Sequence, residues 1–86
     1  MEELGHLRKK IDEVDEQILR LLNERVRICK SIGQAKGKLG IPVRDPVREK
    51  EVYGRVRERA VALGLDSLQV EAVFREIVNM CSAVQE

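Results

Sequence analysis

The sequence predicts an all-α protein of three helices that pairs with a second copy of itself. In the first third of the chain, apolar residues recur at steps of three and four without a proline, which is typical of one long helix over residues 4–36. Two short stretches containing glycine or proline follow, and each precedes another amphipathic segment. With 86 residues and no strand-like alternation, residues 1–86 are predicted to form a single helical domain.

The first helix is too long for its own chain to cover. At 1.5 Å per residue it would extend about 50 Å, whereas a globule of this size has a radius of gyration near ~12 Å. The rest of the chain can shield only part of that length, so a symmetric homodimer is expected to complete the packing. The apolar seam that it would bury consists of Leu4, Leu7, Ile11, Val14, Ile18, Leu21, Arg25, Ile28, Ile32 and Ala35.

Turn-forming and capping residues set the expected limits of the other two helices. A loop is predicted over residues 37–45, because Gly37, Gly40 and Pro42 are turn-forming residues that break the helical pattern. Asp45 suits an N-cap and Pro46 the first position of a helix over residues 46–63. Gly64 suits the end of that helix, and Asp66 or Ser67 would cap a third helix over residues 67–85.

Composition excludes several functional classes. Lys and Arg number 16 against 15 Asp and Glu, and there is no Trp and only one Tyr and one Phe, which argues against nucleic-acid binding. No apolar run approaches the ~20 residues of a membrane span, and no secretory signal is present, so a cytoplasmic location without a membrane partner is expected. Cys29 and Cys81 lack metal-ligand spacing and are interpreted as two buried thiols, with no metal.

Polar residues interrupt the apolar faces at corresponding ends of the three helices. Arg25 and Lys36 lie on the inner side of the first helix, Glu49 begins the stripe of the second, and Gln85 ends the stripe of the third. Any one of them alone fits a register-fixing residue or a structural ion pair. Together they predict a cation-rich, water-poor cavity that suits a small dianion carrying a hydroxyl group.

Arg8 enters the same site only if two chains share it. It precedes Arg25 by 17 residues, which is about 25 Å along a helix, so the two cannot hold one small ligand from the same chain. In an antiparallel dimer, the partner's Arg8 approaches Arg25. Without such a dimer, an arginine beside Lys9 and Lys10 is simply part of a solvated face.

Several longer motifs match a known family. They are LRKKIDEVDEQILRLLNER near the start, IGQAK before the loop, PVRDPVREKEV at the start of the second helix, and the C-terminal run that ends in Gln85. Through these motifs, the sequence resembles the bacterial and archaeal all-helical chorismate mutases over essentially its whole length. The resemblance implies a three-helix protomer, a homodimer with two active sites, and conversion of chorismate to prephenate without a cofactor. No dehydratase or dehydrogenase domain follows in this sequence, so a monofunctional form is expected.

The resemblance also assigns residues to the carboxylate groups of the substrate. Arg25 and the partner's Arg8 match the family's carboxylate clamps, and Arg48 matches an arginine that supports the carboxylate end. Cys81 stands where related sequences carry a serine that contacts a carboxylate. A thiol is a weak donor, so this contact is expected to be weaker or replaced by Ser82 or a backbone group.

Four further residues match positions near the ether oxygen and the hydroxyl group. Lys36 matches the lysine that contacts both a carboxylate and the ether oxygen, and Gln85 matches the donor to that oxygen. Asp45 matches a position whose backbone holds the hydroxyl group, and Glu49 matches the carboxylate that accepts from it.

Two alternative functions remain open from sequence alone. An isochorismate–pyruvate lyase would use a similar cationic pocket on the same scaffold, although Lys36, the RD..RE element and Gln85 match the mutases more closely. A non-catalytic helical dimerisation module would explain the seam, since amphipathic helices most often only pack. It would not explain the inward position of Arg25, Lys36, Glu49 and Gln85.

Overall fold

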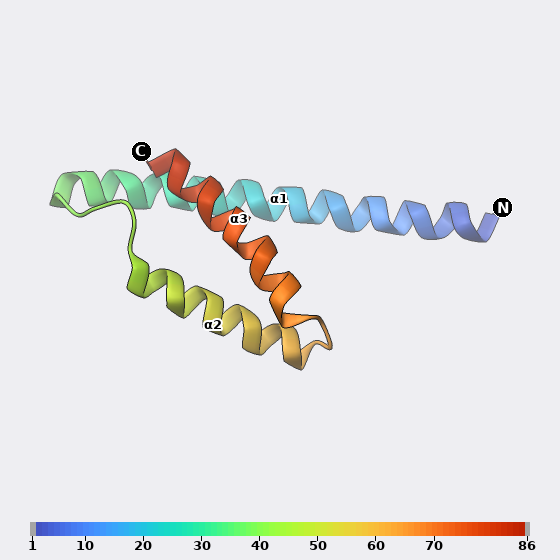
Figure 1. The fold of residues 1–86 in the computed structure, drawn as a ribbon. Coiled ribbons are helices and arrows are strands. Elements are labelled where there is room, and N and C mark those ends of the chain that lie inside the picture. Colours follow the sequence, from blue (N-terminus) through green and yellow to red (C-terminus); the bar gives the residue numbers. More distant parts are fainter. Residues whose placement is uncertain (1, 86) are drawn as a thin grey trace.

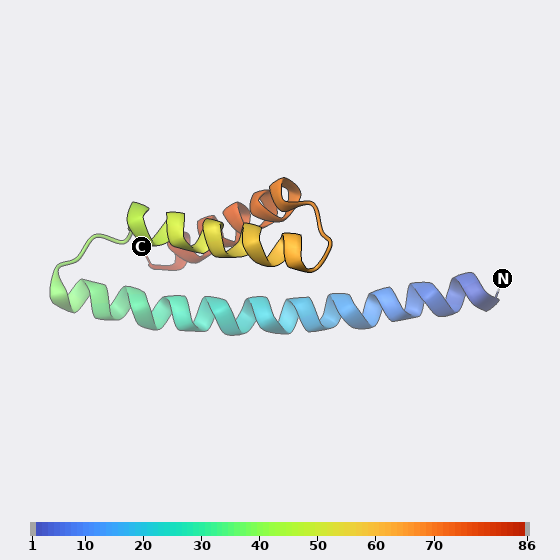
Figure 2. The same cartoon turned by 90° about the horizontal axis from the view of Figure 1, so that it is seen from below.

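The computed structural model describes residues 2–85, which fold into three helices joined by two short loops (Figure 1). The helices are α1 (Glu2–Leu39), α2 (Pro46–Ala62) and α3 (Ser67–Gln85). Helix α1 forms one layer, and α2 and α3 form a hairpin on one side of it (Figure 2). Helix α3 packs against both α1 and α2. The predicted all-α fold with a long first helix is therefore confirmed.

Helix α1 extends beyond its predicted end at residue 36. Gly37 is helical, and the helix ends at Leu39, just before Gly40, which adopts a φ of +68°. That left-handed conformation suits glycine, and it lets the amide of Ile41 donate to the carbonyl of Lys36 at 2.9 Å. The predicted loop over 37–45 is thus shorter, because a glycine inside a helix costs only about 1 kcal/mol and does not have to end it.

Capping side chains begin the other two helices close to the predicted positions. The Asp45 carboxylate accepts from the backbone amide of Arg48 at 3.1 Å, and Pro46 takes the first helical position. Asp66, rather than Ser67, caps α3, since its carboxylate accepts from the amides of Leu68 and Gln69 at 3.0 Å each. Helix α2 ends at Ala62, one residue before its predicted end.

A small core holds α2 and α3 together. Its buried members are Val52, Tyr53, Val56 and Val78, and Val70 and Phe74 pack against them. In α1, only Cys29 is buried among the described residues. The α2–α3 hairpin therefore has its own core, whereas most of α1 lies outside any core formed by one chain.

An ion-pair cluster joins the outer faces of α2 and α3. Glu71 of α3 accepts from Arg57 of α2 and from Arg75 of its own helix. Hydrogen bonds from Arg57, and then from Arg75, lower the pKa of the Glu71 carboxyl from its ordinary value of 4.5. The guanidinium of Arg75 also lies 4.3 Å from the centre of the Tyr53 ring, a cation–π contact that links the cluster to the core.

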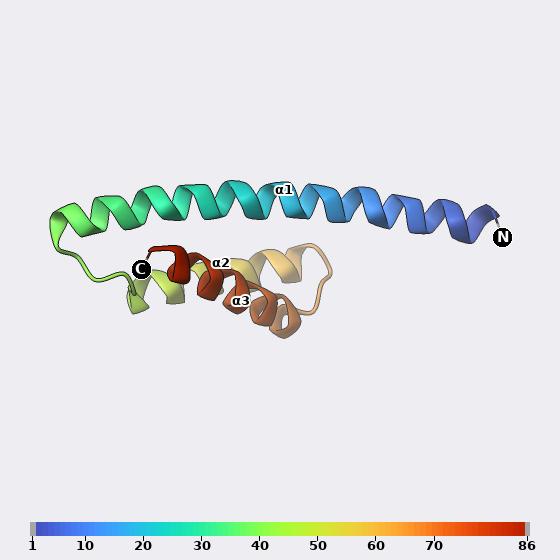
Figure 3. The ribbon, with the colours of Figure 1, turned by 90° about the horizontal axis from the view of Figure 1, so that it is seen from above.

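The N-terminal half of α1 projects beyond the hairpin (Figure 3). The molecule measures 57 × 24 × 15 Å and has a radius of gyration of 16.3 Å, against about 12 Å for a compact globule of this length. The apolar seam on the projecting half is open to solvent, with Ile11 61% and Ile18 50% exposed. Over residues 2–85, no helix is long and apolar enough to cross a membrane.

Candidate active site

A cavity of about 370 Å³ lies where the C-terminal half of α1, the start of α2 and the end of α3 meet. This is within the usual range for a small-molecule site. The cavity brings together every site residue predicted from the sequence except Arg8. Its lining consists of Arg25, Ile28, Cys29, Ile32, Lys36, Val43, Asp45, Arg48, Glu49, Val52, Arg55, Val78, Cys81, Ser82 and Gln85.

The charged part of the lining is mainly cationic. Four side chains are positive, those of Arg25, Lys36, Arg48 and Arg55, and two are carboxylates. Apolar side chains from all three helices form most of the remaining wall, together with the polar side chains of Ser82 and Gln85. A pocket with this balance favours a small anion, and the apolar wall strengthens each polar contact by limiting access of water.

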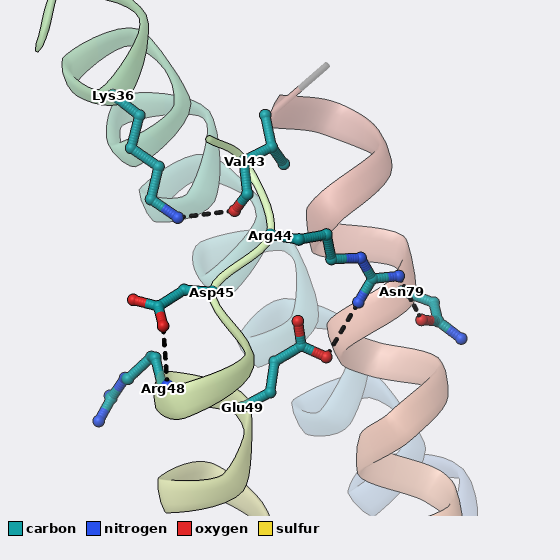
Figure 4. A network of polar contacts seen from close by, with 7 residues as sticks. All are labelled: Lys36, Val43, Arg44, Asp45, Arg48, Glu49 and Asn79. Atoms are coloured by element: carbon teal, nitrogen blue, oxygen red, sulfur yellow. Dashed lines mark hydrogen bonds and ion pairs between the residues drawn. The ribbon is translucent and has the colours of Figure 1, made fainter. Parts of the chain in front are cut away.

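Lys36 connects α1 to the loop that precedes α2 (Figure 4). Its ammonium group donates to the backbone carbonyl of Val43 at 2.7 Å and is partly buried. An ammonium has three N–H donors, so this bond fixes the side chain and leaves two donors for a ligand. The position depends on the continuation of α1 past Gly37, which places Lys36 in a helical turn rather than in a loop.

Glu49 is held by Arg44, a residue that was not predicted as part of the site. Arg44 donates to the Glu49 carboxylate at 3.1 Å and, through its other terminal nitrogen, to the side-chain oxygen of Asn79 at 2.9 Å (Figure 4). The Glu49 side chain is 25% exposed. Arg44 therefore joins the loop, α2 and α3, and it orients the carboxylate. It stands within the PVRDPVREKEV motif, which was the available signal.

Asp45 and Arg48 line the cavity, but both side chains already have partners within the chain. The Asp45 carboxylate is occupied in capping α2 (Figure 4). The guanidinium of Arg48 pairs at 3.2 Å with Glu51, and both side chains are more than half exposed. Arg48 thus lies at the rim of the cavity, where its exposed side chain is free to change partner at low cost, because such surface pairs contribute little to stability.

Arg25 lies against two sulfur atoms. One of its terminal nitrogens is 2.8 Å from the sulfur of Cys81 and 3.8 Å from that of Cys29. Both thiols are buried, at 3% and 7% exposed. Burial, followed by the neighbouring Cys81 thiol, raises the pKa of Cys29, and the charge of Arg25 acts in the opposite direction. Sulfur is a weak acceptor, so Arg25 retains its capacity to bind a carboxylate.

Gln85 reaches the cavity because α3 crosses α1 at a glycine. A Cβ atom added to Gly33 would lie 2.9 Å from the Cα of Gln85, closer than side chains tolerate. The Oε1 atom of Gln85 is buried and has no hydrogen-bond partner among residues 2–85. A buried amide oxygen without a partner carries a cost, which a group that donates a hydrogen bond to it would remove.

Arg8 is not part of this cavity within one chain. It lies on the projecting half of α1, in a shallow depression formed by one helix and lined by Gly5, His6, Arg8, Lys9 and Asp12. The structure thus reproduces the predicted separation of Arg8 and Arg25 along one continuous helix.

Comparisons with known proteins identify the family that this chain resembles over its length. Residues 7–86 match the family model described as chorismate mutase type II. The chain is 37% identical to a chorismate mutase of Methanocaldococcus jannaschii, covering all of this chain and 87% of that protein. It is 39% identical to a bifunctional chorismate mutase/prephenate dehydratase of Aquifex aeolicus, of which it spans only 25%. A solved structure of a conserved hypothetical protein from Pyrococcus furiosus superposes with a TM-score of 0.77 at 35% identity, over 96% of this chain and 95% of that one.

Proposed function

This chain belongs to the chorismate mutase type II family, and we propose that it converts chorismate to prephenate in a pocket that a second copy of the chain completes. The observation that carries the proposal is the convergence of Arg25, Lys36, Glu49 and Gln85 on one cation-rich cavity. These residues come from three helices and are far apart in the sequence. A dimerisation module would not require them to meet.

The reaction is an intramolecular rearrangement, in which one C–O bond breaks and one C–C bond forms within the same molecule. It requires no nucleophile or proton transfer, so the pocket acts through position and charge. Arg25 from one chain and the partner's Arg8 bind the two carboxylates, because a guanidinium grips a carboxylate through two parallel hydrogen bonds. Holding both ends brings the side arm over the ring and removes much of the entropic barrier.

Lys36 and Gln85 act on the ether oxygen. Negative charge grows on this oxygen as the C–O bond breaks, and a fixed donor stabilises it more than it stabilises the ground state. Lys36 is fixed by its bond to Val43 and retains two donors. The side chain of Gln85 lines the same cavity, and its NH₂ group is the donor.

Glu49 and the start of α2 bind the substrate hydroxyl group. The Glu49 carboxylate has one oxygen bonded to Arg44, which leaves further acceptor capacity for the hydroxyl. Asp45, whose carboxylate and carbonyl both accept from amides of α2, lines the same edge of the cavity, and its backbone N–H is the group that would bind the hydroxyl. Arg48 supports the carboxylate end from the rim.

The partner chain supplies Arg8 and the cover for the seam of α1. The projecting half of α1 exposes an apolar face that one chain does not cover, and this face continues the predicted seam. Antiparallel pairing of two chains buries that face. It also brings the partner's Arg8 to the cavity of the first chain.

The test is to incubate the purified protein with chorismate and to identify the product by chromatography. We expect prephenate at a rate far above the uncatalysed reaction. Lys36→Ala should lower kcat roughly a hundredfold or more, since the loss of one oxyanion donor costs about 3–4 kcal/mol. Lys38→Ala is the matched control, because Lys38 lies in the same last turn of α1 but outside the cavity, and its kcat should stay near the unsubstituted value.

Three results would count against the proposal. A folded Lys36→Ala variant with a near-normal kcat would exclude the ether-oxygen role. Pyruvate and salicylate from isochorismate, with no prephenate from chorismate, would identify a lyase. A folded dimer inactive on both substrates would leave the dimerisation module.

A further inference from the structure

The cavity contains two thiol groups that face each other across the α1–α3 interface. Cys29 belongs to α1 and Cys81 to α3, and both sulfurs approach the same terminal nitrogen of Arg25, at 3.8 and 2.8 Å. They lie close together, because both sulfurs are near that one nitrogen, and the Cys81 thiol contributes to raising the pKa of Cys29. Both are free cysteines.

The backbone geometry at this crossing suits a bridge between them. One turn further along each helix, Gly33 and Gln85 are so close that a Cβ atom would not fit between them. Cys29 precedes Gly33 by four residues, and Cys81 precedes Gln85 by four, so each cysteine lies on the same face as the contact. A disulfide requires Cα atoms about 4.4–6.8 Å apart, and we expect Cys29 and Cys81 to meet this requirement because the two helices touch one turn further along.

We propose that Cys29 and Cys81 form an oxidation site within the substrate pocket, at which a small disulfide oxidant such as glutathione disulfide joins the two chain segments. One cysteine sulfur attacks the oxidant and releases one reduced thiol, leaving a mixed disulfide. The second cysteine sulfur then attacks the protein sulfur of that mixed disulfide and releases the second reduced thiol. Two S–H bonds are lost, one Sγ–Sγ bond forms, and the two protons pass to the released thiols.

The position of the pair connects its oxidation state to substrate binding. Arg25 is the cation beside both sulfurs, and under the proposed function it binds a substrate carboxylate. Oxidation removes the Cys81 S–H donor and draws α3 toward α1 at the point where Arg25 is held. We therefore expect the oxidised protein to lose at least tenfold in kcat/KM and to recover on reduction. We also expect a bound substrate to slow oxidation, because it occupies the route to the thiols.

The experiment uses the full chain treated with glutathione disulfide and analysed by intact mass and by peptide mapping without reduction. The expected product has lost two hydrogens and contains a Cys29–Cys81 cross-link within one chain. Cys29→Ser and Cys81→Ser are matched controls, and each should give only a mixed disulfide with glutathione. The Lys36→Ala variant, which should consume chorismate slowly, allows protection by chorismate to be measured.

The outcomes separate this inference from the proposed function. Thiols that stay reduced in the folded protein, while the same chain in denaturant is oxidised, would overturn the oxidation site. A cross-link between two chains would also overturn it. An internal cross-link that leaves kcat/KM unchanged would overturn its effect on catalysis. An internal cross-link in a protein without mutase activity would leave the oxidation site standing and defeat the proposed function instead.

Discussion

Glu71 illustrates how one partly buried side chain can depend on packing between two helices. It accepts from Arg57, which belongs to α2, and from Arg75, one turn further along α3. These two bonds, the first from Arg57, lower the pKa of the Glu71 carboxyl. Because the Arg57 bond exists only when α2 and α3 are packed, the unfolded chain loses it, and the pKa returns toward 4.5.

The sign of the resulting pH dependence follows from that shift. With a lower pKa in the folded state, the stabilisation from Glu71 is fully present above the unfolded pKa and is lost as the pH falls through the folded pKa. We expect the melting temperature of a Glu71→Gln variant to fall less steeply than that of the unsubstituted protein as the pH drops below about 5. The difference should be modest, since both arginine partners are about half exposed and pairs of this kind contribute little.

The measurement is thermal unfolding followed by circular dichroism over that pH range. Glu76→Gln serves as the control, because Glu76 is exposed on the same helix and forms no ion pair within residues 2–85. Equal slopes for the Glu71→Gln and unsubstituted proteins would show that the pair has no effect on stability.

Individual site residues could be predicted from the sequence to different degrees. Arg25, Lys36 and Glu49 stood out because a charged residue in an apolar stripe requires a partner or a ligand, and all three line the cavity. Their catalytic roles remain predictions. Arg44 and Asn79 could not be identified in this way, since they are 35 positions apart and their contact depends on how α2 packs against α3.

At the scale of whole helices, the crossing of α1 and α3 determines the shape of the cavity. Gly33 permits the backbone of Gln85 to approach, so an alanine there would force α3 away from α1. Gly33→Ala should therefore lower kcat/KM at least tenfold, because a displaced Gln85 no longer reaches the ether oxygen. It should also reduce stability by about 1–3 kcal/mol, the usual cost of overpacking.

Gly37→Ala is the matched control for this prediction. Gly37 lies one turn later in the same helix, and a Cβ atom there would meet nothing within 4 Å. We expect this substitution to stabilise the protein by about 0.5–1 kcal/mol, since alanine loses less backbone entropy in a helix. Steady-state kinetics and urea unfolding measure both effects. Normal activity in Gly33→Ala would mean that Gln85 does not need its present position.

The end of α1 was harder to predict than the position of the helix, because two glycines near it are both possible end points. Gly37 and Gly40 are both plausible ends for α1 by residue type, and only Gly40 takes the left-handed conformation. Residue type alone does not decide between them, and contacts formed on folding, such as the bond from Lys36 to Val43, are absent from any local pattern. The capping residues Asp45 and Asp66 are local signals, and the starts of α2 and α3 were accordingly predicted within a residue.

Across the whole molecule, the long seam of α1 was the most informative sequence feature. It predicted a helix longer than its own chain can cover, and the structure has that shape. It also predicted a dimer, which remains a proposal. The family predicted from the motifs is confirmed by the match over residues 7–86, since those motifs span all three helices.

The sharing of one pocket by two chains gives a prediction that mixing of variants can test. Arg8→Ala and Arg25→Ala should each be nearly inactive alone, because every site in either homodimer lacks one clamp. After joint refolding of equal amounts, half of the dimers should be mixed, and one of the two sites in each mixed dimer should be intact. We expect about one quarter of the unsubstituted activity per chain.

The matched control is a mixture of Arg25→Ala with Lys36→Ala, whose defects fall on residues that one chain contributes to the same pocket. Both sites of that mixed dimer stay defective, so no activity should return. Chain exchange is verified by native mass spectrometry, and mixed dimers of Arg8→Ala with Arg25→Ala that remain inactive would show that Arg8 does not act on the partner's pocket.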